Sequence, residues 1–425
     1  AVAVIISGSS IPISAAGTLS VVNPSTYIES AAFSGSKHDM LGIAQNFHLF
    51  SDGTVTLTAH TNGNIVADTL YAGSRVFGTR NVSNEISYAR SVKTCNGFTN
   101  TTAPYLETLI FPGTNTYYVE NDGRVSFSGG SPNVGIFYLE AATKYIDIGA
   151  EFAKLYVESK AVASHATSAG VTLNTADMNN ATVTVPNNNG ISYLNVTASQ
   201  LMTLPGLKIN GIYTANANQS LVINVDMKGL TTCSFNPQIM VYFNGDADYQ
   251  KYQERTDFSN SRILFNFYDS SKADSNYTGT LTLEKSFTGC VLAPKATVTT
   301  NSNIDGNIIA HNINIKAESH RWDYMGKLDD IVAIPPKPSV SVGNYVWLDA
   351  DKDGIQDAAE TGISGVVLKI TGPSGAAVTN VDGTVVGPVT TDASGAYSFA
   401  KLPVLTAGQT YTVTIDTTAS ATALA

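Results

Sequence analysis

The sequence predicts a mainly β protein, with a β-helix or solenoid-like head that carries one packed α-helix, followed by a small β-sandwich. Only 14% of the 425 residues are charged, whereas about 25% is usual for a soluble domain. Ser, Thr, Asn and 35 Gly make up the difference, which excludes helical bundles and coiled coils. The 20 Tyr and 16 Phe can supply a core, which excludes a disordered chain.

Short segments of alternating apolar and polar residues predict the strands. Residues 53–58 and 123–128 each follow an Asp-Gly turn signal and alternate with period two. Residues 181–185, 220–225 and 296–300 continue the pattern. Alternation of this kind places one side of each strand inward and the other outward.

One segment, from Asp147 to Thr167, predicts a helix instead. It contains many alanines, no proline and no glycine after Gly149. Its apolar side chains fall on one side at helical spacing: Phe152, Leu155, Tyr156, Val162 and Ala163. Lys154 lies opposite, with Glu158 and Lys160 at the flanks. A single amphipathic helix among strands must bury its apolar side on a sheet or solenoid face.

A short repeat favours a solenoid over other β folds. Gly63–Ala67 reads GNIVA, and Gly306–Ala310 reads GNIIA. Glycine-led apolar steps suit the tight turns of solenoid coils. If the repeat is not a coincidence between two ordinary strands, it places early and late sequence in adjacent rungs of one domain.

A proline-rich segment divides the chain. Residues 334–338 read IPPKP, which cannot form a helix or a central strand and predicts a stiff linker. We therefore predict a head domain at 1–333, a linker at 334–338 and a sandwich at 339–425. The strands expected in the sandwich are residues 340–348, 362–370, 391–399 and 410–415.

The most specific chemical pattern follows this linker. Carboxylates stand at positions 1, 3, 5, 9 and 12 of a loop with glycine at position 6, which is the spacing of a Ca²⁺ loop. The predicted Ca²⁺ ligands are Asp349, Asp351, Asp353, the Ile355 carbonyl, Asp357 and Glu360, with Gly354 at the sharp bend. Strand-like sequence flanks the loop on both sides, so the predicted role is structural and not that of a sensor.

Charge, hydropathy and cysteine content limit the partners. The net charge of −10 with few basic residues argues against nucleic acid and anionic membranes. No run of about 18 apolar residues is present, so no membrane insertion is expected. Three cysteines, Cys95, Cys233 and Cys290, exclude a disulfide scaffold, although Cys233 and Cys290 could either pair or remain buried thiols.

The sequence after the linker resembles a known family. The stretch YVWLDADKDGIQDAAETGISGVVLKI, followed by TTDASGAYSFAKLP, is similar to the calcium-binding B-type repeats of the serine-aspartate repeat surface proteins of Gram-positive bacteria. The resemblance implies an immunoglobulin-like, prealbumin-like sandwich that stiffens a stalk when calcium binds. It also implies further repeats and a cell-wall anchor beyond Ala425. The Lys–Asn isopeptide bond of related collagen-adhesin domains is not expected, because residues 340–348 contain no lysine.

The head resembles the choice-of-anchor A (collagen-binding-like) adhesin domain. The resemblance rests on Ile263–Tyr268, Phe287–Val298, Asp305–Ala310 and Glu318–His320. It implies a β-helical, surface-exposed adhesive head. We therefore expect a non-catalytic cell-surface adhesin that binds a glycan or a matrix protein. The alternatives are a surface-tethered carbohydrate-active β-helix enzyme and a structural pilus or surface-layer subunit.

Three other patterns are weaker. Asp246 and Asp248 lie in a polar cluster that predicts an exposed loop, with a second cation site as the alternative. Ser319, His320 and Asp323 are too close along one strand to form a catalytic triad, because neighbouring side chains point to opposite faces. Ice binding would need regular threonine ladders, and the Thr-x-Thr runs at 54–58, 182–184 and 297–299 are few and unevenly spaced.

Overall fold

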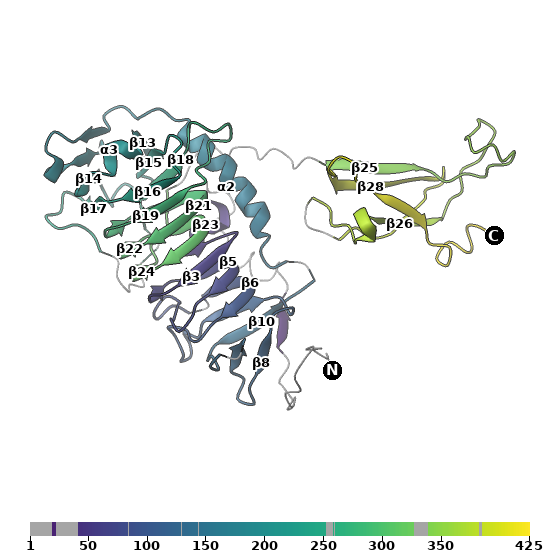
Figure 1. The fold of residues 1–425 in the computed structure, drawn as a ribbon, viewed down its shortest axis with the longest axis horizontal. Coiled ribbons are helices and arrows are strands. Elements are labelled where there is room, and N and C mark those ends of the chain that lie inside the picture. Colours follow the sequence, from purple (N-terminus) through teal and green to yellow (C-terminus); the bar gives the residue numbers. More distant parts are fainter. Residues whose placement is uncertain are drawn as a thin grey trace. The chain divides into compact units, whose positions relative to one another are not determined.

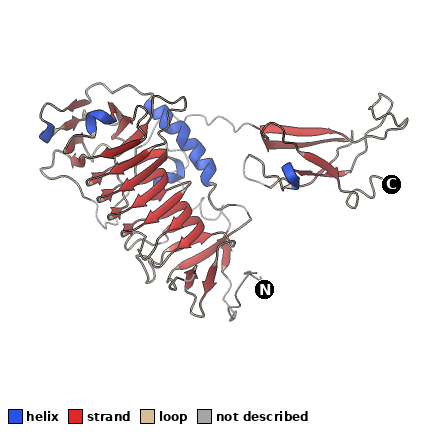
Figure 2. Cartoon of the chain, viewed as in Figure 1, coloured by secondary structure: helices blue, strands red, loops and turns tan. Residues whose placement is uncertain are grey.

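The protein is mainly β, as predicted, and strands dominate the computed structural model (Figure 2). The structure describes residues 19–22, 41–83, 85–128, 130–142, 144–251, 258, 260–326, 339–381 and 385–425. The chain forms two compact units, residues 1–333 and 334–425. The predicted proline linker at 334–338 lies outside the described residues.

The first unit is a three-sided solenoid of mostly parallel strands (Figure 1). We call its first side the helix-covered face. In spatial order its strands are β1 (Ser20–Val22), β10 (Ile136–Glu140), β7 (Thr108–Phe111), β6 (Ile86–Thr94), β5 (Ile65–Tyr71), β2 (Leu49–Phe50), β23 (Ile308–Ile315), β21 (Cys290–Thr300), β18 (Ile263–Tyr268), β15 (Ser220–Asp226) and β13 (Ile191–Thr197).

The second side, which we call the threonine face, shares four long strands with the first. β5, β6, β21 and β23 turn the corner and continue into it. There they pair with β3 (Thr54–Leu57), β19 (Thr280–Leu283) and, through β19, β16 (Thr232–Phe235). The alternation predicted for residues 53–58 holds in β3, and β19 shows it too, since both bury every second side chain. The prediction is wrong for residues 220–225, because every side chain of β15 is buried.

The third side consists of two short sheets. One contains β11 (Thr172–Asn174), β12 (Thr182–Thr184), β14 (Gly206–Ile212) and β17 (Gln238–Phe243), and the other contains β20 (Phe287–Thr288), β22 (Ile304–Asp305), β24 (Ser319–His320) and β4 (Thr61–Asn62). The hairpin β8 (Tyr117–Val119) and β9 (Val125–Phe127), the short helix α3 (Ala198–Leu201) and the 3-10 turns η2 (Gly42–Asn46) and η3 (Met178–Asn180) complete the unit.

The rungs are not stacked in sequence order. β2 lies between β23 and β5, with Leu49 beside Ile308 on one side and Ile65 on the other. Figure 1 shows the purple early strands next to the green late strands. Early and late sequence therefore share adjacent rungs of one domain, as predicted, but the two copies of the repeat are not in adjacent rungs, because β2 lies between β5 and β23.

Helix α2 (Ile148–Ala163) runs along the helix-covered face across β21, β18 and β15 (Figure 1). Its 16 residues span about 24 Å, which equals about five strand spacings. Phe152, Leu155 and Val162 pack on outward side chains of the sheet such as Val222 and Leu264. The strands beneath the helix are thus buried on both sides.

Buried amides fasten α2 to the sheet. Asn224 donates to the Val162 carbonyl, and Asn266 donates to the Ser159 carbonyl, both at 2.9 Å. The Ser159 hydroxyl donates back to Asn266 Oδ1 at 2.6 Å. Asn195, Asn224 and Asn266 occupy one register position on three neighbouring strands, so their amides also bond to one another.

The helix is shorter than predicted at its carboxyl end, and one flank residue is buried. Asp147 caps the start, but the helix ends at Ala163, because Ser164 donates to the Ala161 carbonyl and the His165 ring stacks on Tyr193. Asn195 then binds the His165 carbonyl, which turns residues 165–167 onto the sheet.

Glu158, predicted at the flank of the helix, is instead buried, and burial raises its pKa to about 7.

The asparagine of the short repeat has the same structural role in both copies, Gly63–Ala67 and Gly306–Ala310. Asn64 donates its side-chain amide to the Asn46 carbonyl at 3.1 Å, and Asn307 donates to the Gln45 carbonyl at 2.8 Å. Both asparagines therefore hold η2 against the corner where their rungs enter the helix-covered face. The preceding glycines are required by close approaches, since a Cβ at Gly63 would collide with His48.

A buried ion-pair cluster joins the late and early rungs. Arg321 contacts Glu85 and Asp323, each at 2.7 Å, and donates to the Asn46 carbonyl at 2.7 Å. Its side chain is only 10% exposed, and that of Glu85 is 1% exposed. Glu107 approaches the same cluster and accepts from Asn100 at 2.6 Å. Burial, together with the charge of Glu85, raises the pKa of Glu107 to about 10.

The second unit is the predicted β-sandwich. One sheet pairs β25 (Ser339–Tyr345) with β28 (Ala396–Pro403), and the other contains β27 (Val389–Thr390), β26 (Val367–Thr371) and β29 (Thr412–Ile415). A 3-10 turn, η4 (Pro373–Gly375), follows β26. The core is small and consists of Val366, Leu368, Ile370, Val378, Phe399 and Leu402.

The three cysteines are free thiols, so Cys233 and Cys290 do not pair. Burial raises the pKa of Cys233 to about 11 and that of Cys290 to about 12. Cys290 donates to the Trp322 carbonyl at 3.1 Å. These thiols fill the core.

Arg321→Met should destabilise the head by about 3–5 kcal/mol, because it leaves Glu85 and Asp323 buried without their cation. Chemical unfolding of the full chain measures the loss. Arg321→Lys keeps the charge but not the forked contacts, so its unfolding free energy should lie between those of the unmodified chain and Arg321→Met. A loss below 1 kcal/mol for Arg321→Met would contradict a role for this cluster in closing the solenoid.

Glu107→Gln should make the head more resistant to alkali. The pKa of Glu107 in the folded head lies above its ordinary value. The stability that the protonated carboxyl contributes is therefore complete below about pH 4.5 and is lost as pH rises toward about 10. The slope is at most about 1.4 kcal/mol per pH unit. Gln stays neutral and should flatten the pH profile of the unfolding free energy.

Glu85→Gln is the contrasting variant for this pH series. Glu85 accepts from the Thr79 amide and from Arg321, so its loss should destabilise the head at neutral pH. An unchanged pH slope in Glu107→Gln would show that Glu107 does not hold the proton.

Candidate functional site

The threonine face presents two straight rows of small polar side chains. Strand register places equivalent residues of successive rungs side by side. The first row is Thr232, Thr280, Thr297, Asn312, Thr54, Thr69 and Ser91, and the second row is Ser234, Thr282, Thr299, Asn314, Thr56 and Tyr71. Both rows are uncharged.

A buried apolar row lies behind the two polar rows and makes the face rigid. Each rung contributes one core side chain between its two outward ones: Cys233, Leu281, Val298, Ile313, Val55 and Leu70, none more than 4% exposed. Outward residues two apart on a strand are about 6.7 Å apart, and rungs are about 4.8 Å apart. The face is therefore a periodic array of hydroxyl and amide groups.

The expectation that the Thr-x-Thr runs are too few and too uneven to align is wrong. The runs at 54–56 and 297–299 are separated by 243 residues in sequence (297 − 54), but only the rung of Asn312 and Asn314 lies between them. The run at 182–184 lies elsewhere, on the third side. Sequence spacing gave no measure of alignment because the rungs do not stack in chain order.

Charged side chains border this face at the corner with the helix-covered face. His311 Nδ1 lies 2.8 Å from Asp52 Oδ1, Lys295 Nζ lies 2.6 Å from Asp274 Oδ2, and the Asp68–Arg90 pair measures 3.3 Å. Exposed pairs of this kind contribute at most about 1 kcal/mol each. Their effect here is to confine charge to the border of the array.

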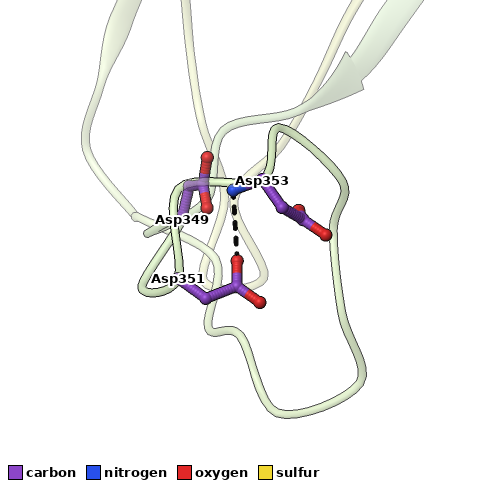
Figure 3. A group of neighbouring side chains, drawn as sticks. All are labelled: Asp349, Asp351 and Asp353. Atoms are coloured by element: carbon purple, nitrogen blue, oxygen red, sulfur yellow. Dashed lines mark hydrogen bonds between the residues drawn. The ribbon is translucent and has the colours of Figure 1, made fainter.

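The predicted calcium loop joins β25 to β26 in the second unit. Its base is closed by antiparallel bonds, in which Leu348 donates to the Thr361 carbonyl and Ile363 donates to the Val346 carbonyl. The carboxylates of Asp349, Asp351 and Asp353 each offer an oxygen within 4.8 Å of the other two (Figure 3). Gly354 has a φ of +79°, the conformation that glycine adopts most readily.

The donor set of this loop fits a hard cation. Asp349 Oδ2 accepts from the Gly354 amide at 3.1 Å, whereas Asp349 Oδ1 is buried and has no hydrogen-bond partner among the residues that the structure describes. A buried carboxylate oxygen without a partner is costly unless a cation binds it. Oxygen ligands at this spacing are those that Ca²⁺ prefers.

The other predicted ligands lie near the cluster but outside it. Glu360 accepts from the Ala350 amide at 2.7 Å and from the Asp357 amide at 3.1 Å, so it links the two ends of the loop. The Ile355 amide donates to Asp353 Oδ1 at 2.7 Å. The structure thus gathers three of the five carboxylates and holds the fourth, Glu360, against the loop backbone.

No second group of this kind occurs in the part of the chain that the structure describes. Asp246 accepts from the Gln250 side chain in an exposed turn, and Asp248 is exposed. Glu254, Arg255 and Asp257, which follow in sequence, lie outside the described residues.

Ser319 and His320 turn to different partners, as expected for neighbours on a strand. Ser319 Oγ lies 2.9 Å from His48 Nε2, and His320 Nδ1 lies 2.7 Å from Asp305 Oδ1. All four side chains are buried. Burial and the charges of His320 and Arg321 lower the pKa of His48 well below its ordinary value. The four side chains therefore form a buried polar cluster.

Comparison with protein families accounts for both units. Residues 40–321 match the model of the putative ice-binding-like adhesive domain. The chain belongs to this family. Residues 340–424 match the SdrD B-like domain. Both descriptions concern adhesive or surface-protein domains and neither names a catalytic activity, while the choice-of-anchor A resemblance remains a prediction.

Curated relatives match the second unit alone. Serine-aspartate repeat-containing protein F of Staphylococcus epidermidis is 44% identical over 81 residues, which is 19% of this chain and 4% of that protein. Bone sialoprotein-binding protein of Staphylococcus aureus is 43% identical over 86 residues, which is 20% of this chain and 6% of that protein. The match thus spans a small fraction of these relatives.

Two solved structures are similar to the head. The ice-binding protein of the Antarctic ascomycete Antarctomyces psychrotrophicus is 13% identical, with a TM-score of 0.28 over 66% of this chain and 96% of that one. The ice-binding protein 1 domain of Shewanella frigidimarina is 13% identical, with a TM-score of 0.26 over 68% and 98%. Among the described residues, no helix is long and apolar enough to cross a bilayer.

The sequence reasoning missed the threonine face, although a signal was present. The Thr-x-Thr pattern alone marks three of its rungs, at 54–56, 280–282 and 297–299, and the sequence reasoning used only the first and the last. Allowing Ser and Asn at the outer positions adds Thr232–Ser234 and Asn312–Asn314. The common pattern is one buried apolar residue between two small polar residues.

Proposed function

We propose that this chain is the head and first stalk unit of a cell-surface adhesin, and that the head attaches through the threonine face. The observation that carries the proposal is the alignment of two uncharged polar rows over six rungs of a rigid solenoid. The adhesive family of the head and the B-like match of the second unit support it.

The chemistry of the face favours a repeating, hydroxyl-rich ligand such as a glycan. Thirteen outward positions carry eight threonines, two serines, two asparagines and one tyrosine, Tyr71. Interfaces with folded proteins depend on buried aromatic and arginine anchors, and these two rows offer Tyr71 alone. A matrix protein is therefore the less favoured ligand within the same proposal.

Ice is a second candidate ligand. It is favoured by the regular spacing of the two rows and by the description of the family that the head belongs to. A flat array of hydroxyl and methyl groups can hold ordered water at the surface. Both ligands would use the same face, so one set of variants tests the surface and two assays distinguish the ligands.

Thr282→Tyr should strongly weaken ligand binding without unfolding the head. A large ring in the second row would hold a flat ligand away from the face and lower its affinity by more than about tenfold. Thr184→Tyr, on an exposed strand position of the third side, is the matched control. Glycan-array binding and the fraction of protein incorporated into a growing ice front are the measurements.

The outcome of these assays assigns the ligand class. If Thr282→Tyr loses glycan binding and Thr184→Tyr keeps it, the result supports the adhesin. If Thr282→Tyr loses ice incorporation and Thr184→Tyr keeps it, the result supports ice as the ligand. If both variants retain the binding of the unmodified chain, the threonine face is not the attachment surface.

For the second unit, we propose that Asp349, Asp351 and Asp353 bind Ca²⁺, with Glu360, Asp357 and the Ile355 carbonyl completing its coordination. When bound, the cation would join the carboxylates and stiffen the connection between β25 and β26. The gathered carboxylates and the unpartnered Asp349 oxygen support this assignment.

Ca²⁺ should bind the full chain with one site and stabilise the second unit. Stabilisation is expected to reach about 2.7 kcal/mol when free Ca²⁺ is 100 times its dissociation constant. Asp353→Ala should remove the binding heat in titration calorimetry and the EDTA-dependent shift in melting temperature. Asp248→Ala, in the head, is the control and should change neither; equal effects of both variants would contradict the assignment.

A further inference from the structure

One rung of the threonine face differs from its neighbours in chemistry. β23 presents Asn312 and Asn314, whereas β21 on one side presents Thr297 and Thr299 and β3 on the other presents Thr54. This rung lies where the late strands meet the early strands. The two asparagines therefore stand in the middle of the array and at its seam.

The orientation of the Asn312 amide is fixed by a backbone donor. The Thr54 amide N–H donates to Asn312 Oδ1 at 2.9 Å, so the carbonyl oxygen of that side chain faces β3. Its Nδ2 consequently faces the opposite neighbour and lies 3.3 Å from Thr297 Oγ1. Asn314 Nδ2 lies at the same distance, 3.3 Å, from Thr299 Oγ1.

These contacts set the polarity of two hydroxyl groups. An amide N–H can only donate, so the oxygens of Thr297 and Thr299 accept. Each hydroxyl proton must then point away from the asparagine. The bond also favours one χ1 rotamer of each threonine out of the staggered set, and a fixed side chain loses less entropy when a ligand binds.

We propose that Asn312 and Asn314 are positioning residues of the threonine face. They hold the half-buried Thr297 and the buried Thr299 in one rotamer, so that each hydroxyl proton points away from its asparagine. The proposal rests on the proposed function, in which this face binds the ligand. The side-chain arrangement itself can be measured without any ligand, so the two ideas can fail separately.

The test relies on each asparagine contacting a different threonine, Asn312 with Thr297 and Asn314 with Thr299. In the full chain with methyl-labelled threonine, three-bond couplings and methyl shifts report the χ1 populations of Thr297, Thr299 and Thr282. Asn312→Ala should average the rotamers of Thr297 and leave Thr299 unchanged, and Asn314→Ala should do the reverse. Thr282, one rung beyond Thr299, is the internal reference and should move in neither variant.

Ligand affinity should follow the rotamers. Each single variant should weaken binding to the glycan or ice surface about threefold to tenfold, in line with the loss of one oriented hydrogen bond. Asn210→Ala, an asparagine beside Thr184 in the same register on the third side, is the matched control and should not affect binding. Asn314→Ala leaves the bond from Thr54 to Asn312 intact, so it tests the proposal even if Asn312→Ala fails to fold.

Unchanged rotamers of Thr297 and Thr299 in both variants would overturn the proposal. So would equal changes at Thr282, which would indicate a general loosening of the face. Selective rotamer changes in a chain that binds neither ligand would support the positioning role and overturn the proposed function instead. Selective changes with unaltered affinity would show that the fixed hydroxyls do not serve binding.

Discussion

Arg321 is the cation on which closure of the solenoid depends. It follows the last rung in sequence and contacts Glu85, which lies at the start of β6, 236 residues earlier. Because the early strands β2 and β3 lie in the middle of the stack, next to the late strand β23, something must hold the late rung against the early one. Strand pairing of β23 with β2 and β3 does part of this, and the buried contacts of Arg321 with Glu85, Asp323 and the Asn46 carbonyl do the rest.

The closure of the stack in turn creates the candidate attachment surface. β3 supplies Thr54 and Thr56 from the early sequence, and β21 supplies Thr297 and Thr299 from the late sequence. The rows are continuous only because β23 joins the two halves. The same seam carries the two asparagines that fix neighbouring hydroxyls. Stability and function are thus linked through the register between β23 and β3.

The low charge of the chain follows from this architecture. Strands beneath α2, such as β15 and β18, are buried on both sides, since the helix and its apolar contacts cover their outward side chains. The threonine face replaces charged residues with hydroxyls and amides, and ion pairs such as Lys295–Asp274 stand at its border. In the second unit, acidic residues are concentrated in one loop, where Asp349, Asp351 and Asp353 converge.

The sequence by itself determined the class of the fold, the position of α2, the boundary between the two units and the convergence of three aspartates on one short loop. Each of these depends on residues close together in the chain, for which periodicity, proline and fixed ligand spacing are sufficient signals. The end of α2 was set instead by contacts of Ser164 and His165. The burial of Glu158 was set by the packing of the helix on the sheet. Only the tertiary structure decided the order of the rungs, and with it the threonine face and the partners of Arg321. The physical reason is that register between strands hundreds of residues apart is fixed by packing and hydrogen bonds across the stack, and not by any local pattern.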